Sequence, residues 1–202
     1  MKRPAVTAAA ALPDQGFGQR APIWWGSALM IVIEVGGLAI LVATYFYIWR
    51  NFDTWPPTGT LVPDLGVPTI NLLVLLASVL PMRYVARLAH RYGSPKVLGS
   101  WLLLCVLFGL TAAVLRVLEF KGVHTRFYSN AYGAIVWSIL AVHFAHIIAA
   151  TLETLVIGVG MFLGRVAEQQ FVDVAANAVY WYFVVFSWVG LYVIVFFAPR
   201  VR

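Results

Sequence analysis

Two histidines and a carboxylate form the most suggestive chemical pattern in the chain. His143 and His146 lie three residues apart in a long apolar run, and Glu153 follows seven residues after His146. On a helix this spacing places the three side chains along nearly one stripe. Histidines at positions i and i+3 can share a cation, but metal sites recruit several convergent groups, and the spacing offers no evident third ligand. The pattern therefore favours hydrogen bonding across a helical bundle over a metal site.

Glu34 is a second ionisable residue in an apolar run. It follows Trp24, the start of that run, by ten residues, or about 15 Å along a helix, which is near the middle of a bilayer. A charged carboxylate there costs at least about 2.5 kcal/mol unless it is protonated, hydrogen-bonded or hydrated. Two interpretations stay open: a protonatable group in a cavity or at a partner subunit, and a carboxyl group hydrogen-bonded between helices for packing.

Haem ligation and thiolate chemistry are not predicted. A bis-histidine haem needs axial ligands from opposite faces, but only His143 and His146 are embedded, and both are on one helix. The other two histidines, His90 and His124, fall in predicted loops on opposite sides of the membrane. The single cysteine, Cys105, has no partner for a disulfide or a thiolate cluster within the chain.

The elements that position these residues are membrane-spanning helices. Of 202 residues, 62% are hydrophobic and 11% are charged, so lipid must be the solvent for most of the chain. Apolar runs long enough to span a bilayer cover residues 24–49, 67–89, 98–118, 132–162 and 172–197. None has the alternating pattern of a barrel strand. The sequence predicts an all-α integral membrane bundle of five transmembrane helices over residues 24–198, preceded by a cytoplasmic N-terminal arm, residues 1–23.

Basic residues suggest how the bundle is oriented. Arg83, Arg87 and Arg91 recur every four residues, which would line one helix face at the cytoplasmic boundary, within reach of lipid headgroups. We therefore expect a cytoplasmic N-terminus and a periplasmic or outside C-terminus. The net charge of +6 is explained by basic cytoplasmic loops, so no nucleic-acid partner is expected.

Arg116 and Glu119 stand at the end of the third apolar run, at i and i+3. This spacing lets the pair neutralise itself, and its position predicts a snorkelling anchor near the outer interface. Small residues in the first and fourth runs, Gly36-Gly37 and Gly158, would permit close helix approach or subunit contact.

Five short motifs, in the same order along the five runs, resemble the subunit III family of haem-copper oxidases. They are Met30-Ile-Val-Ile-Glu34, Pro68-Thr-Ile-Asn71 with Ser78, Leu118-Glu119-Phe120, Tyr132-Gly133 with His143-Phe-Ala-His146, and Tyr180-Trp181-Tyr182-Phe183. The chain departs from the family pattern where Tyr182 and Val185 replace His and Asp, and where Leu72 replaces Thr. It is identified as a shorter, five-helix and divergent member.

The resemblance implies a non-catalytic subunit of a proton-translocating terminal oxidase in aerobic respiratory electron transport. Such a chain would be a multi-pass protein of the cell inner membrane with no haem or copper of its own, these being expected in partner subunits. It would pack against the catalytic subunit I and against subunit II. It would also bind phospholipid in a cleft between helices and support proton uptake. The polar residues that would contact the cleft, lipid or a subunit are Glu34, Asn71, Glu119, His143, His146, Glu153 and Trp181.

Other functions are not separated by sequence alone. A subunit III-like accessory protein of nitric oxide reductase would share these motifs, and a haem-free assembly factor is also open. A small transporter is less favoured because the span count is odd and no internal repeat is evident. Neither does the chain indicate whether cytochrome c or quinol is the electron donor. Our specific hypothesis is that Glu34 meets the His143/His146 ridge across the bundle and holds the shape of the cleft.

Overall fold

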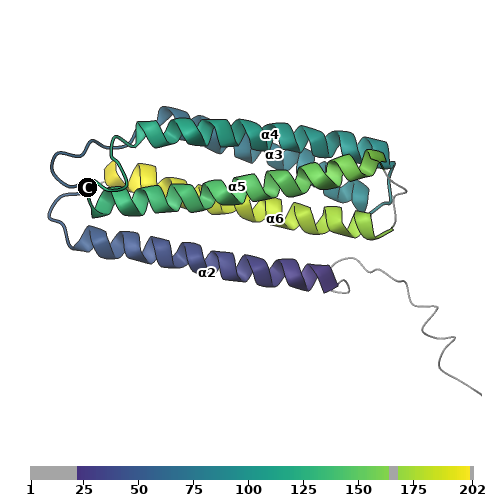
Figure 1. The fold of residues 1–202 in the computed structure, drawn as a ribbon, viewed down its shortest axis with the longest axis horizontal. Coiled ribbons are helices and arrows are strands. Elements are labelled where there is room, and N and C mark those ends of the chain that lie inside the picture. The colour runs from purple at the N-terminus through teal and green to yellow at the C-terminus, as the bar shows by residue number, and fades with distance from the viewer. Residues whose placement is uncertain (1–21, 164–167, 201–202) are drawn as a thin grey trace, which may run out of the picture.

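The computed structural model describes residues 22–163 and 168–200, and these contain five long helices and no strand (Figure 1). The helices are α2 (Pro22–Arg50), α3 (Gly66–Ala89), α4 (Pro95–Gly122), α5 (Ala131–Leu163) and α6 (Glu168–Tyr192). A short π-helical turn, η2 (Val193–Phe197), and a 3-10 turn, η3 (Ala198–Arg200), extend α6. All five are long and apolar enough to cross a membrane, which confirms the predicted fold class.

The predicted N-terminal arm, residues 1–23, lies outside the described residues except for Pro22 and Ile23, which begin α2. The cytoplasmic location of this arm and the placement of the C-terminus across the membrane stay predictions.

Helices α3, α4, α5 and α6 form the core, and α2 lies along one side of it (Figure 1). Within the core, α4 packs against α3 and α5, and α6 packs against the same two helices. The outlying α2 contacts α5 and α6. Only Leu38 and Tyr45 of α2 are buried. Most of the surface of α2 is therefore left to lipid or to another chain.

Two helix ends differ from the prediction in ways that matter for charged residues. The third span was expected to end at residue 118, but α4 continues to Gly122, so Arg116 lies six residues before its end. By contrast, α3 ends at Ala89, which leaves Arg91 in the following turn. The expected helix face of three arginines is therefore wrong for Arg91, and only Arg83 and Arg87 lie on α3, both exposed.

The loop between α2 and α3 is fixed to the bundle by one aromatic side chain. Trp55 is buried and donates a hydrogen bond from Nε1 to Oη of Tyr45, at 2.8 Å. Its ring stacks on Trp49 and meets the edge of Tyr132, with centroids 5.7 and 4.8 Å away. This cluster brings the loop close to the start of α5.

Close approach between α4 and α5 depends on glycine. A Cβ atom added at Gly109 would lie 2.2 Å from Oγ1 of Thr151, and one at Gly158 would lie 3.2 Å from Cβ of Leu102. Gly36 and Gly37 are different, because an added Cβ there meets no atom within 4 Å. The two α2 glycines therefore have no packing role among the described residues, whereas Gly109 and Gly158 do.

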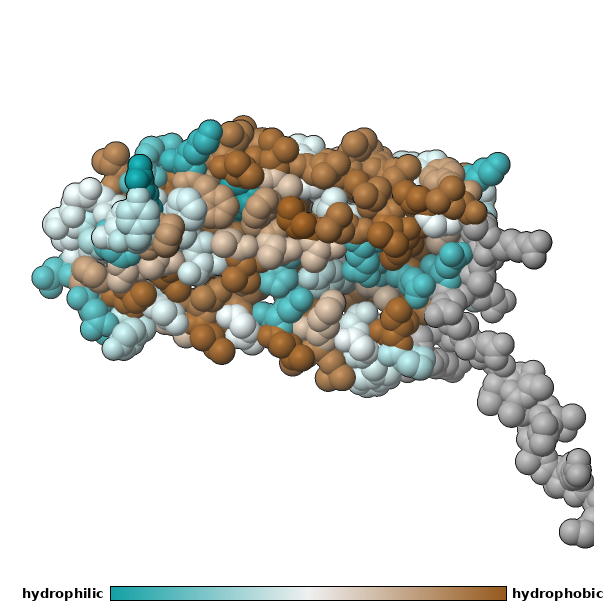
Figure 2. Space-filling view, viewed as in Figure 1, coloured by the Kyte–Doolittle hydropathy of each residue, from teal (hydrophilic) through white to brown (hydrophobic). Residues whose placement is uncertain are grey.

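The surface agrees with a membrane location. Hydrophobic residues cover most of the upper part of the molecule in Figure 2, where Figure 1 places α4. The chain is a multi-pass membrane protein.

Candidate functional site

The centre of the bundle contains an ion pair. Arg116 and Glu119 of α4 are both fully buried, and the guanidinium Nη1 donates to Oε2 of the carboxylate. Asn71 of α3 donates from Nδ2 to Oε1 of Glu119, at 2.6 Å. The predicted snorkelling anchor is thus wrong: α4 extends past the pair, so the two side chains turn into the bundle rather than toward an interface. Pairing is required there because an isolated charge in a low-dielectric interior is too costly.

His143 of α5 is held by both ring nitrogens. Nη2 of Arg116 lies 3.0 Å from Nδ1, and Nε2 lies 2.9 Å from the backbone oxygen of Val184 in α6. A guanidinium can only donate and a carbonyl can only accept. His143 must therefore accept at Nδ1 and donate from Nε2, which defines the neutral Nε2–H tautomer.

Trp188 of α6 closes the cluster. The guanidinium carbon of Arg116 lies 3.5 Å from the centroid of the indole ring, within the range of a cation–π contact. The His143 ring is stacked on the same indole, with centroids 4.8 Å apart. Both rings are fully buried. The arginine charge is thus matched by a carboxylate, an imidazole nitrogen and an aromatic face.

We call Asn71, Arg116, Glu119, His143 and Trp188 the central cluster. Its members come from α3, α4, α5 and α6, so it connects all four core helices. The one positive and one negative charge cancel, and the full burial of every member closes the cluster to substrates. The cluster therefore has a structural role: its hydrogen bonds hold the four core helices in one specific arrangement.

A second polar group connects α2 to the core. Tyr180 of α6 donates from its hydroxyl to Oε1 of Glu34, at 3.3 Å, and Nε2 of His146 lies 3.7 Å from Oε2 of Glu34. The side chains of Glu34 and His146 are 20% and 14% exposed. We call Glu34, His146 and Tyr180 the α2 contact.

The hypothesis that Glu34 meets a histidine ridge is therefore correct in geometry for His146 and wrong for His143. The two imidazoles belong to different groups, because the ring nitrogens of His143 are already engaged by Arg116 and by the backbone oxygen of Val184. Whether either group holds a lipid cleft in shape stays a prediction.

The remaining predicted site residues are placed separately. Trp181 is buried and donates from Nε1 to Oγ of Ser78, at 2.9 Å, which joins α6 to α3. Glu153 is exposed on α5, and its carboxylate interacts with the side chain of Asn177 in α6. A role for Glu153 in a cleft or subunit contact stays a prediction.

Sequence reasoning missed Trp188 and the backbone oxygen of Val184. No spacing rule connects Trp188 with Arg116, because the two side chains meet across helices far apart in sequence. A usable signal was present, since an arginine within a span needs a carboxylate or an aromatic face nearby.

The fold and the two polar groups define a class: multi-pass helical membrane proteins in which paired polar side chains join five apolar helices. A family model described as cytochrome c oxidase subunit III matches residues 16–199. The chain belongs to the cytochrome c oxidase subunit III family.

Curated relatives agree with this family. The chain is 28% identical over 171 residues to cytochrome c oxidase subunit 3 of Triticum aestivum and 27% identical over 171 residues to that of Arabidopsis thaliana. Each alignment covers 84% of this chain and 58% of the relative, so the chain spans little more than half the length of these two proteins. The subunit 3 of Thermostichus vulcanus is 26% identical over 163 residues, covering 79% of both chains.

Proposed function

We propose that this chain is the non-catalytic subunit III of a proton-translocating haem-copper terminal oxidase. The observation that carries the proposal is the family match over residues 16–199, which includes every described helix. The fully buried, charge-compensated central cluster supports a structural role, because it stabilises the bundle without offering access to a substrate.

In this proposal oxygen is reduced in partner subunits. Haem and copper reside in partner subunits, and this chain packs against the catalytic subunit I and against subunit II, and supports proton uptake by the catalytic subunit. The exposed surface of α2 suits such a partner, because Gly36 and Gly37 leave room for a second helix.

Bound phospholipid is part of the same proposal. An apolar groove of about 470 Å³ runs between α2 and α6, and its walls include Leu38, Val42, Phe186 and Leu191. Such a groove suits an acyl chain, while the exposed Arg83 and Arg87 suit lipid phosphates at one end of α3. If that end faces the cytoplasm, the chain sits in the cell inner membrane with its N-terminus inside, as the positive-inside rule favours.

We propose that the α2 contact is the part of this chain that supports the catalytic subunit. Glu34 is the carboxyl group through which α2 meets both His146 and Tyr180, so it fixes the helix that borders the groove. We propose that this contact maintains the groove and the surface presented to the partner.

Depletion and re-addition of the chain tests the proposal. The oxidase complex is stripped of this chain in detergent, and its haem spectrum, initial oxygen consumption and decay of activity during turnover are followed. We expect an unchanged haem spectrum, a retained initial rate and faster decay that re-added chain reverses. Loss of haem together with the chain, or an unchanged decay, would overturn the non-catalytic supporting role.

A further inference from the structure

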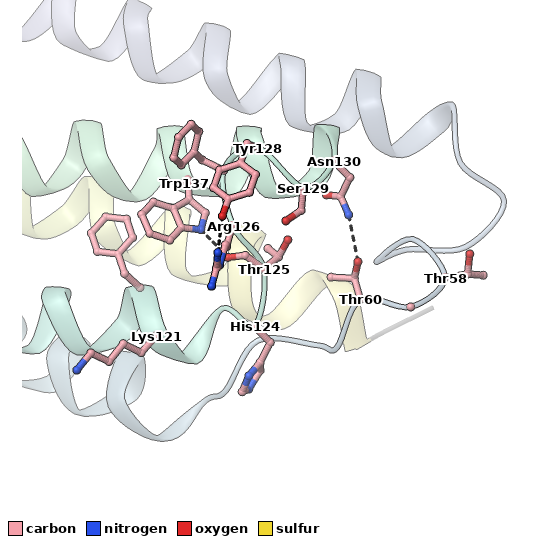
Figure 3. A pocket seen from close by; sticks show the side chains of 13 residues that line it. Thr58, Thr60, Lys121, His124, Thr125, Arg126, Tyr128, Ser129, Asn130 and Trp137 are labelled. Atoms are coloured by element: carbon pink, nitrogen blue, oxygen red, sulfur yellow. Dashed lines mark hydrogen bonds between the residues drawn. The ribbon is translucent and has the colours of Figure 1, made fainter.

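A polar hollow of about 820 Å³ lies between the α2–α3 loop and the α4–α5 loop (Figure 3). Its walls are fixed by hydrogen bonds between elements. Asn130 donates from Nδ2 to Oγ1 of Thr60, at 3.2 Å, which joins the two loops. Trp137 of α5 donates from Nε1 to the backbone oxygen of Thr125, at 2.8 Å. The hollow is separate from the central cluster and from the α2 contact.

Three basic side chains line this hollow, Lys121, His124 and Arg126, and no carboxylate is among its lining residues. His124 already has a partner outside the lining, because its Nε2 lies 3.1 Å from a carboxylate oxygen of Asp64. Arg126 donates from Nη1 to the hydroxyl of Tyr128, and this hydrogen bond raises the pKa of Arg126. Among the described residues, Nη2 of Arg126 and the ammonium of Lys121 have no hydrogen-bond or ion-pair partner.

Hydroxyl and aromatic groups complete the surroundings. Thr58, Thr125 and Ser129 contribute hydroxyl groups to the lining, which can donate hydrogen bonds to an oxyanion. Phe120 and Trp137 form an aromatic wall, with ring centroids 4.6 Å apart. Aromatic rings next to basic side chains at helix ends are typical of the membrane–water interface. The hollow thus combines basic side chains, hydroxyl donors and an aromatic wall, which is the combination typical of a lipid headgroup region.

We propose that this hollow binds a phosphate group, carried by the headgroup of an anionic phospholipid or supplied as free phosphate. Arg126 and Lys121 provide charge-assisted hydrogen bonds to the phosphate. The planar guanidinium of Arg126 matches the geometry of phosphate oxygens better than the ammonium of Lys121 does. The hydroxyl groups supply the remaining donors, and the aromatic wall accommodates the glycerol and upper acyl carbons when the phosphate belongs to a lipid. This site is distinct from the groove between α2 and α6 and from Arg83 and Arg87, and it does not depend on the proposed oxidase role.

Binding to matched single-charge variants tests the site. The full-length chain is titrated with phosphatidylglycerol in detergent, and lipid-bound species are counted by native mass spectrometry for wild type, Arg126→Gln, Lys121→Gln and Arg50→Gln. Arg50 is the control, because it is exposed at the end of α2 and does not line the hollow. We expect Arg126→Gln and Lys121→Gln each to weaken binding about tenfold, and Arg50→Gln less than twofold.

A parallel titration identifies the source of the phosphate. Inorganic phosphate is added to the lipid-free chain and then in competition with phosphatidylglycerol. Phosphate binding that Arg126→Gln abolishes supports free phosphate as a ligand, whereas lipid binding that phosphate does not displace supports the headgroup. Equal losses of binding in Arg126→Gln and Arg50→Gln would overturn the site, because binding would then depend only on general surface charge. No loss of binding in either hollow variant would overturn it as well.

Discussion

The guanidinium of Arg116 lies over the indole of Trp188, with 3.5 Å between its central carbon and the ring centroid. The same guanidinium contacts the Glu119 carboxylate and Nδ1 of His143. The buried positive charge of Arg116 is thereby surrounded by the Glu119 carboxylate, the lone pair of a His143 ring nitrogen and the aromatic face of Trp188. The stability of the bundle should therefore depend on Arg116 more than on any exposed basic residue.

Replacing Arg116 by methionine should destabilise the chain by about 3–5 kcal/mol, because the buried Glu119 carboxylate loses its counter-charge. The measurement is the free energy of unfolding in mixed detergent micelles. The exposed Arg50→Gln variant is the control and should change this free energy by less than about 0.5 kcal/mol.

A double variant separates charge compensation from packing. Arg116→Met with Glu119→Met should recover much of the lost stability, since replacing both partners of a buried ion pair by apolar side chains is often neutral. If the double variant is as unstable as the sum of the two single variants, the pair is not coupled as the structure indicates.

His143 should be the neutral Nε2–H tautomer at neutral pH. The reason is geometric: Nδ1 faces the donor Arg116 and Nε2 faces the acceptor oxygen of Val184. Nitrogen NMR of chain labelled at histidine, compared with His143→Phe for assignment, reads this directly. A protonated Nδ1 would contradict the hydrogen-bond pattern of the central cluster.

The fold could be predicted from the sequence because apolar runs of sufficient length dictate membrane-spanning helices. The limits of the prediction appear at Arg116. Its position near the end of the apolar run suggested an interface, but helix α4 continues through Phe120 to Gly122. Once the helix extends past it, burial and pairing with Glu119 follow from the cost of an unpaired charge.

Partners from other helices were harder to foresee. The i, i+3 spacing of His143 and His146 correctly placed both on α5, but it does not specify what lies opposite each ring. His143 contacts Arg116 and Trp188, whereas His146 contacts Glu34 and Phe183. Helical periodicity encodes a direction on one helix, and the identity of the neighbour depends on how the five helices pack.

Gly109→Ala should destabilise the chain by about 1–3 kcal/mol, because the new methyl group would overlap Thr151 and push α4 away from α5. Gly37→Ala is the matched control, since its Cβ meets no atom within 4 Å and alanine favours the helix. Unfolding of both variants in detergent measures the difference. Equal stabilities would show that α4 and α5 do not approach at Gly109.

Glu34→Ala should shorten the active lifetime of the oxidase complex several-fold, whereas Glu34→Gln should retain most of it. Glutamine keeps an oxygen that can accept the hydrogen bond from Tyr180, and alanine does not. The measurement is the decay of oxygen consumption during turnover after each variant is reconstituted into depleted complex. A glutamine variant as short-lived as the alanine variant would favour a proton-transfer role for Glu34 over a packing role.

The most direct test of the central claim is the composition and activity of the complex purified through an affinity tag on this chain. An oxidase subunit III should bring with it haem and copper bound by partner subunits, and the preparation should consume oxygen. A preparation without haem, or one that consumes nitric oxide but not oxygen, would contradict the assignment of this chain to a terminal oxidase.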